Sequence, residues 1–187
     1  MAVSEQDTDE RLLLAMSGGD MEAMTAFYRR HETRLYRYLL SKLNDSFAAA
    51  DLLNEVMLEV WRSAARFAGR SKVTTWMFGI AHNKVLSFWR KQGQREFTEL
   101  DDNLPDDAPG ADLEQALSAV KDAEVLRACM QALSPPHREV LHLVFFEELD
   151  YAEISSILKV PEGTVKSRVY HAKILLKKQL TNAMRSP

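Results

Sequence analysis

The stretch LDYAEISSILKVPEGTVKSRVYHAK, residues 149–173, predicts two helices joined by a tight turn. Asp150 can cap the first helix, and Glu153, three residues later, completes the reciprocal pair called a capping box. Lys159 stands in the turn where a glycine is common, and Pro161 suits the first turn of the next helix. This arrangement is a helix-turn-helix, a motif whose second helix enters the major groove of DNA.

The second helix has an apolar stripe and a polar face rich in hydrogen-bond donors. Its apolar residues recur with the helical period, at Val165, Val169, Ala172, Leu176 and Leu180. We expect Ser167, Tyr170, His171 and Lys178 to point away from the core, flanked by Lys166 and Lys173 on one side and Arg168 on the other. A lone basic helix is more typical of a solvated surface, but the preceding helix and turn favour DNA contact here.

The net charge of -3 hides an uneven distribution along the 187 residues. Residues 25–95 carry thirteen basic side chains against five acidic ones, whereas residues 96–114 carry eight acidic side chains and no basic one. Charge blocks of this kind are typical of interaction surfaces.

Several functional classes find no support in the sequence. Cys129 is the only cysteine, so a disulfide or a cysteine-based metal site is excluded, and we expect a buried, inert thiol. The five histidines lack metal-binding spacing, and no glycine-rich loop could cradle a phosphate. We therefore expect a protein that is not an enzyme and that binds neither a cofactor nor a metal ion. The acidic N-terminus and short apolar runs predict a cytoplasmic protein without membrane insertion.

Helical periodicity fills two blocks, so we expect an all-α fold of two small domains. The first domain spans residues 1–92 and includes a long helix capped by Asp20, a second helix marked by apolar residues from Leu53 to Ala64, and a third helix from about Ser71 to Gln92. Residues 93–112 form an acidic, proline-containing segment that predicts a flexible linker. Residues 113–187 form the second domain, which contains a helix at 113–133, a second helix with Ser134 as its cap and Pro135 in its first turn, and the helix-turn-helix.

The third helix interleaves aromatic and basic side chains, a combination that suits single-stranded nucleic acid. The residues concerned are Trp76, Phe78, Phe88 and Trp89, with Lys72, Asn83, Lys84, Arg90 and Lys91. Aromatic residues at helical spacing are more often part of the core, and for Phe78 and Trp89 we expect the core.

Both blocks resemble the extracytoplasmic-function (ECF) group of bacterial RNA polymerase sigma factors. DLLNEVMLEVW (51–61) resembles the segment with which these proteins grip the polymerase clamp, and TWMFGIAHNKVLSFWRK (75–91) resembles their promoter-melting segment. Residues 132–173 resemble their region 4. The resemblance implies a region 2 domain, a linker that runs through the polymerase cleft and a region 4 domain.

The resemblance also implies a role for particular residues. Asp51, Asn54 and Glu55 would meet the clamp, although the family commonly has Gln where Asn54 stands. Trp76, Asn83, Lys84, Arg90 and Lys91, with the loop 66–72, would hold the opened -10 element. Lys166, Ser167, Arg168, Tyr170 and His171 would face the -35 element, and the family usually has Arg where His171 stands. The implied partners are the clamp and flap of core polymerase, promoter DNA and an anti-sigma factor.

Three alternatives are compatible with parts of the sequence. A helix-turn-helix regulator acting without polymerase would leave the 51–91 pattern and the acidic segment unused. An enzyme acting on nucleic acid would need an active site, which the sequence does not show. An interaction protein that sequesters a partner would not need to bind DNA.

Overall fold

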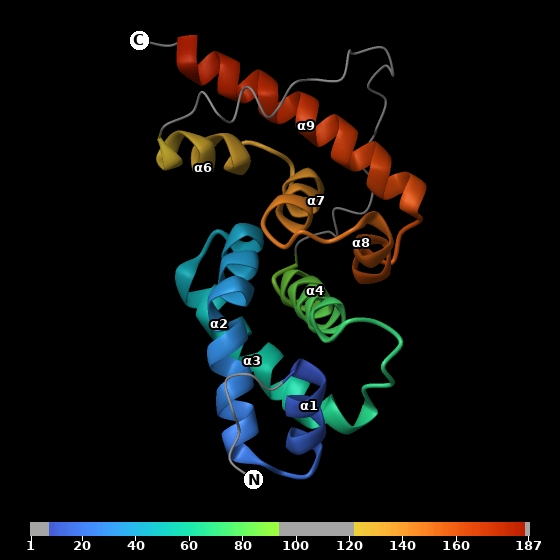
Figure 1. The fold of residues 1–187 in the computed structure, drawn as a ribbon. Coiled ribbons are helices and arrows are strands. Elements are labelled where there is room, and N and C mark those ends of the chain that lie inside the picture. The colour runs from blue at the N-terminus through green and yellow to red at the C-terminus, as the bar shows by residue number, and fades with distance from the viewer. Residues whose placement is uncertain (1–7, 94–121, 186–187) are drawn as a thin grey trace. The chain divides into compact units, whose positions relative to one another are not determined.

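A computed structural model describes residues 8–93 and 122–185, and within these ranges the secondary structure is helical, with no strand. The helices form two compact units, one holding the helices up to residue 91 and the other most of the residues from 123 onward (Figure 1). The prediction of an all-α fold with two helical domains is confirmed. The predicted linker, apart from Gly93, and residues 113–121 of the helix predicted at 113–133 lie outside the described residues, so the domain boundaries stay predictions.

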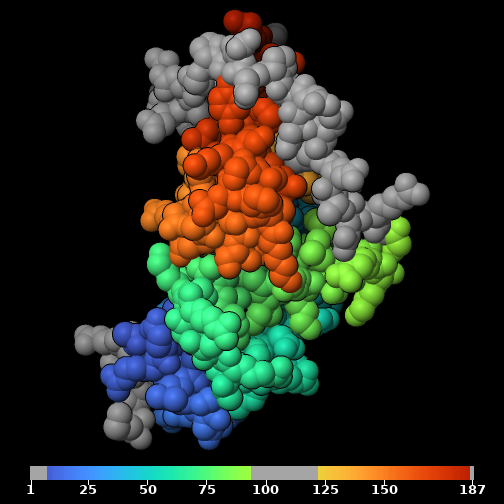
Figure 2. Space-filling view, turned by 90° about the vertical axis from the view of Figure 1, so that its right-hand side faces the viewer, coloured from blue at the N-terminus to red at the C-terminus, as the bar shows by residue number. Residues whose placement is uncertain are grey.

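The first unit is a bundle of four α-helices and a short 3-10 turn. Its elements are α1 (Asp9–Ser17), α2 (Met21–Leu43), α3 (Ser46–Ser63), η1 (Ala64–Arg66) and α4 (Val73–Lys91). Helix α3 packs against both α2 and α4, while α1 packs against α2 and η1. Figure 2 shows the last of these contacts on the surface, with α1 in blue beside the green of η1 and the loop that follows it.

Local capping and apolar burial account for this bundle. The carboxylate of Asp20 accepts hydrogen bonds from the backbone N–H groups of residues 22 and 23, as predicted, and Asp45 caps α3 in the same way. Phe78 is fully buried edge-on against Tyr38, with ring centroids 5.2 Å apart. Trp89 is also buried, beneath the ammonium of Lys42, which lies 4.9 Å from the ring centroid. The prediction that Phe78 and Trp89 belong to the core is confirmed.

A polar contact ties α1 to α2. One carboxylate oxygen of Asp9 lies 2.8 Å from Nη1 of Arg30, and the other lies 3.0 Å from Nε2 of His31, whose ring is buried. Burial alone would raise the pKa of Asp9, but the hydrogen bonds and charges of His31 and Arg30 together outweigh it, so the pKa lies below its ordinary value. The ionised carboxylate therefore stabilises the docking of α1.

We expect Asp9→Asn to lower the free energy of unfolding by about 1 to 2 kcal/mol at pH 7. Because the pKa of Asp9 is lower in the folded than in the unfolded chain, this contribution is present above the ordinary Asp pKa and is lost as the pH falls through the lowered value. Thermal melts between pH 7 and pH values below about 3.9 should show the two proteins converging in acid. The neighbouring exposed acid provides the control, Glu10→Gln, and a pH-independent gap for Asp9→Asn would contradict the assignment.

The second unit is built around its last helix. It contains α6 (Ala123–Gln131), α7 (Pro135–Phe145), α8 (Tyr151–Leu158) and α9 (Glu162–Arg185), and α9 packs against both α6 and α7. Cys129 is buried on α6, and burial raises the pKa of its thiol. The predicted buried cysteine is thus confirmed, and the raised pKa disfavours the reactive thiolate.

The helix-turn-helix forms where the sequence predicted it. Asp150 and Glu153 make both hydrogen bonds of the capping box. Lys159 has φ +56°, the left-handed conformation for which glycine is the usual choice, and the hydroxyl of Ser155 closes the turn by donating to the carbonyl of Val160. Pro161 lies one residue before α9 rather than in its first turn, since its carbonyl accepts the N–H of Val165 as an N-cap residue does.

Candidate functional site

Helix α3 presents a polar face opposite its buried one. Asp51, Asn54 and Glu55 are all exposed, and the opposite side of the helix is buried through Leu53, Val56 and Val60. The amide oxygen of Asn54 accepts a hydrogen bond of 3.3 Å from the hydroxyl of Tyr28 on α2. The structure thus brings the three predicted residues together on one surface.

Two large apolar side chains lie on the same face of α3, and the sequence reasoning missed them. Phe47 is 85% exposed and Leu58 is 45% exposed. They lie four residues before and seven residues after Asp51, so the helical spacing places them in line with the acids. The sequence does contain a signal for them, because each is an apolar residue at a helical position that is otherwise occupied by polar residues. We call Phe47, Asp51, Asn54, Glu55 and Leu58 the α3 surface.

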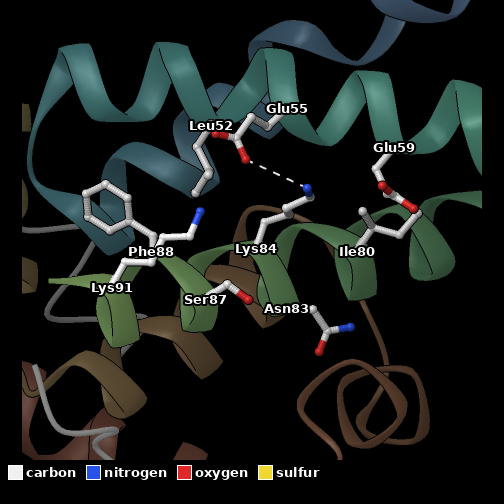
Figure 3. Close-up of a pocket in the computed structure, with 9 residues that line it drawn as sticks. All are labelled: Leu52, Glu55, Glu59, Ile80, Asn83, Lys84, Ser87, Phe88 and Lys91. Atoms are coloured by element: carbon white, nitrogen blue, oxygen red, sulfur yellow. Dashed lines mark ion pairs between the residues drawn. The ribbon is translucent and has the colours of Figure 1, made fainter. Parts of the chain in front are cut away.

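A groove of about 490 Å³ separates the exposed edges of α3 and α4 (Figure 3). Its polar lining comes from both helices, with Glu55 and Glu59 on α3 and Asn83, Lys84, Ser87 and Lys91 on α4. The ammonium of Lys84 lies 3.7 Å from Oε2 of Glu55, an ion pair that crosses the groove. The groove therefore joins residues predicted to meet two different partners.

The residues predicted for the -10 element occupy two places on α4. Asn83, Lys84 and Lys91 line the groove. Arg90, the residue before Lys91, is exposed but is not part of the groove lining. Trp76 does not line the groove: it is half-buried, with its ring centroid 5.2 Å from that of Phe67 in the loop 66–72. The other residues from 66 to 72 are exposed. The basic end of α4 and the aromatic pair near its start are thus separate features.

Helix α9 carries the residues predicted for the -35 element. Lys166 is exposed, and Ser167, Arg168 and Tyr170 are partly exposed. His171 is only 4% exposed, so the prediction that it points away from the core is wrong. Helix α9 packs against both α6 and α7, and its buried residues include His171 in addition to the apolar stripe.

The exposed cations of α9 extend beyond its first turns. Lys178 is exposed, as predicted, and Lys173 is partly exposed with its ammonium 5.5 Å from the ring centroid of Phe145. Cations that are at least partly exposed are therefore spread along most of the helix, which suits contact with a phosphate backbone.

Within residues 8–93 and 122–185, no cluster of three or more His, Cys, Asp or Glu side chains could hold a metal ion. None of the helices in these ranges is both long enough and apolar enough to span a membrane.

Two family models match the chain, one in each unit. The model of Sigma-70 region 2 matches residues 27–95, and that of Sigma-70, region 4 matches residues 123–176. The first range contains the α3 surface and the groove, and the second contains the helix-turn-helix.

The chain is also similar to individual sigma factors over most of its length. It is 32% identical over 154 residues to the ECF RNA polymerase sigma factor SigM of Bacillus subtilis, covering 80% of this chain and 90% of that protein. It is 29% identical over 167 residues to the RNA polymerase sigma factor YlaC of the same organism, covering 87% of this chain and 94% of that protein.

The fold has a counterpart among solved structures. The sigma factor RpoE in complex with the anti-sigma factor NepR from Bartonella quintana superposes with a TM-score of 0.63 at 24% identity, over 83% of this chain and 96% of that one. Together with the two family models and the identity to SigM, the arrangement of helices shows that this chain belongs to the ECF group of the sigma-70 family of RNA polymerase sigma factors.

Proposed function

We propose that this chain binds core RNA polymerase and directs it to promoters by recognising a -35 and a -10 element. One observation carries the proposal: one unit bears the α3 surface and the other bears a helix-turn-helix, in a chain that is 32% identical to the ECF sigma factor SigM. RNA synthesis itself belongs to the polymerase, so this chain contributes recognition and opening of DNA rather than catalysis, and it acts in the cytoplasm where both partners are found.

Each surface has a chemistry suited to one partner. The α3 surface combines exposed acids with two exposed apolar side chains, a mixture typical of protein–protein contacts, and we assign it to the polymerase clamp. Asn83, Lys84, Arg90 and Lys91 offer amide and ammonium or guanidinium donors to the opened -10 strand. The rings of Trp76 and Phe67 could stack on an unpaired base beside the loop 66–72.

We assign the -35 element to α9. Lys166, Ser167, Arg168 and Tyr170 are at least partly exposed near its N-terminal end, which is the end of a recognition helix that contacts base edges. The burial of His171 removes it from this set.

By analogy with RpoE, which is bound to the anti-sigma factor NepR, we propose that an anti-sigma protein controls this chain as well.

Run-off transcription tests the central proposal. Purified core polymerase would be mixed with the chain and a library of random DNA, and the transcribed templates would be recovered. We expect transcripts from a shared sequence pattern only when the chain is present. Failure to bind core polymerase, with no transcript from any template, would refute the proposal and favour a regulator that binds DNA without polymerase.

We expect Phe47→Ala and Leu58→Ala each to weaken core binding about tenfold, because apolar anchors often dominate an interface. Neither change should lower the melting temperature appreciably, since both side chains are exposed in the free chain. Titration of core polymerase with a fluorescent chain measures the affinity. The matched control is Leu14→Ala, which removes an exposed leucine from α1. An affinity loss equal to that control would exclude the two residues from the interface.

A further inference from the structure

The ion pair across the groove joins residues that we assign to two different partners. Glu55 belongs to the α3 surface assigned to polymerase, and Lys84 belongs to the α4 residues assigned to DNA. In the unbound chain their charged atoms lie 3.7 Å apart (Figure 3). The same carboxylate and the same ammonium therefore cannot each be fully available to an external partner while this contact persists.

We propose that this pair restrains DNA binding by the free chain: Glu55 holds Lys84 until polymerase takes over the carboxylate, and Lys84 then turns to the DNA. The inference rests on the proposed function, because it needs both partners. It gives Glu55 a second role, that of a positioning residue acting through Lys84.

The geometry of the pair suits exchange rather than permanent attachment. A separation of 3.7 Å is longer than a normal N–H···O hydrogen bond, so the contact is electrostatic and weakly directed. The side chain of Glu55 is 54% exposed, so that a polymerase donor can reach it, while that of Lys84 is 30% exposed. Lysine carries its charge on a flexible four-carbon stem, which allows the ammonium to move to a phosphate without a change in the helix.

Glu59 shows that the pairing is specific to one acid. It lies one turn further along α3 and lines the same groove, but its carboxylate lies near Ile80 in Figure 3 while the ion pair joins Lys84 to Glu55. Glu59 thus offers a matched control, since Glu59→Gln removes one negative charge from the groove and leaves the pair intact.

Linkage makes the expected effect reciprocal. If the pair competes with polymerase for Glu55, then Lys84→Gln should strengthen core binding in the absence of DNA. If the pair also competes with DNA for Lys84, then Glu55→Gln should strengthen binding of single-stranded DNA in the absence of polymerase. For a pair this exposed, each gain should be about two- to fivefold and should shrink as salt is added.

A double-mutant cycle tests the proposal. The wild type, Glu55→Gln, Lys84→Gln and the double variant would be titrated against core polymerase without DNA. The same four proteins would be titrated against a single-stranded oligonucleotide bearing the -10 sequence that the holoenzyme selects. We expect Lys84→Gln to bind core more tightly than wild type, and this gain to vanish in the Glu55→Gln background. We expect Glu55→Gln to bind the oligonucleotide more tightly, Glu59→Gln to gain less, and the Glu55→Gln gain to vanish in the Lys84→Gln background.

The outcomes separate this inference from the function on which it rests. A wild-type chain that neither binds core nor supports transcription would refute the proposed function. A wild-type chain that does both, together with a Lys84→Gln variant that binds core no better, would overturn the exchange alone. A Glu55→Gln variant that binds the oligonucleotide no better than wild type, including the case in which neither binds, also counts against it.

Discussion

Replacing Asp51 with Arg is expected to lower the affinity of the chain for core RNA polymerase about a hundredfold. Asp51 lies near the middle of the α3 surface, between Phe47 and Leu58, so a partner that covers both apolar side chains must also cover this carboxylate. We expect basic groups of the partner to face this acidic residue. An arginine would place like charges against each other, and such juxtapositions cost several kcal/mol.

The folded chain itself should tolerate this change. Asp51 is exposed and lies inside α3 rather than at its cap, so the free energy of unfolding should change by no more than about 0.5 kcal/mol. Equilibrium titration gives the affinity, and a thermal melt verifies the fold. Glu10→Arg makes the same charge change at an exposed position on α1 and should leave core binding nearly unchanged. Equal losses in the two variants would point to net charge rather than to the α3 surface.

The features that the sequence predicted well are local ones. The caps at Asp20 and Asp150, the capping box with Glu153 and the tight turn between the two helices of the motif each depend on a few neighbouring residues. Helical periodicity likewise accounts for the shared exposed face of the acids of α3, because a single helix fixes which residues share a side. These elements could be predicted since no distant part of the chain has to be known.

The features that the sequence did not predict depend on packing between elements. His171 was expected outside because it lies far from the apolar stripe of α9, yet its side chain is buried. Glu147 was not predicted to be buried, and its carboxylate lies 3.4 Å from Nε2 of the equally buried His142. The contact of Asp9 with His31 and the pair of Glu55 with Lys84 join residues more than twenty positions apart. No periodicity within one helix contains that information.

Removing both cations at the start of α9 is expected to have an effect as large as the change at Asp51. We expect the double variant Lys166→Ala, Arg168→Ala to lower the affinity of the holoenzyme for its selected promoter about a hundredfold and to relax the base preference in the -35 element. A good bidentate contact between a side chain and a base contributes about 1 to 3 kcal/mol to discrimination. Arg168 can make such a contact through its guanidinium, and the exposed ammonium of Lys166 can bind either a base or a phosphate.

A variant at Lys178 distinguishes recognition of bases from nonspecific electrostatic binding to DNA. Lys178 is exposed on the same helix but three turns beyond Lys166, so we expect it to meet phosphates rather than bases. Lys178→Ala should therefore weaken binding to all sequences alike and reduce the slope of log affinity against log salt by about one. Binding-site selection at one fixed salt concentration would compare the base preferences of the wild type and both variants, and titrations over a range of salt would give the slopes. If the double variant selects the same -35 sequence as the wild type and differs only in its salt slope, then Lys166 and Arg168 bind the backbone, and Ser167 and Tyr170 are left as the residues of α9 that read the bases.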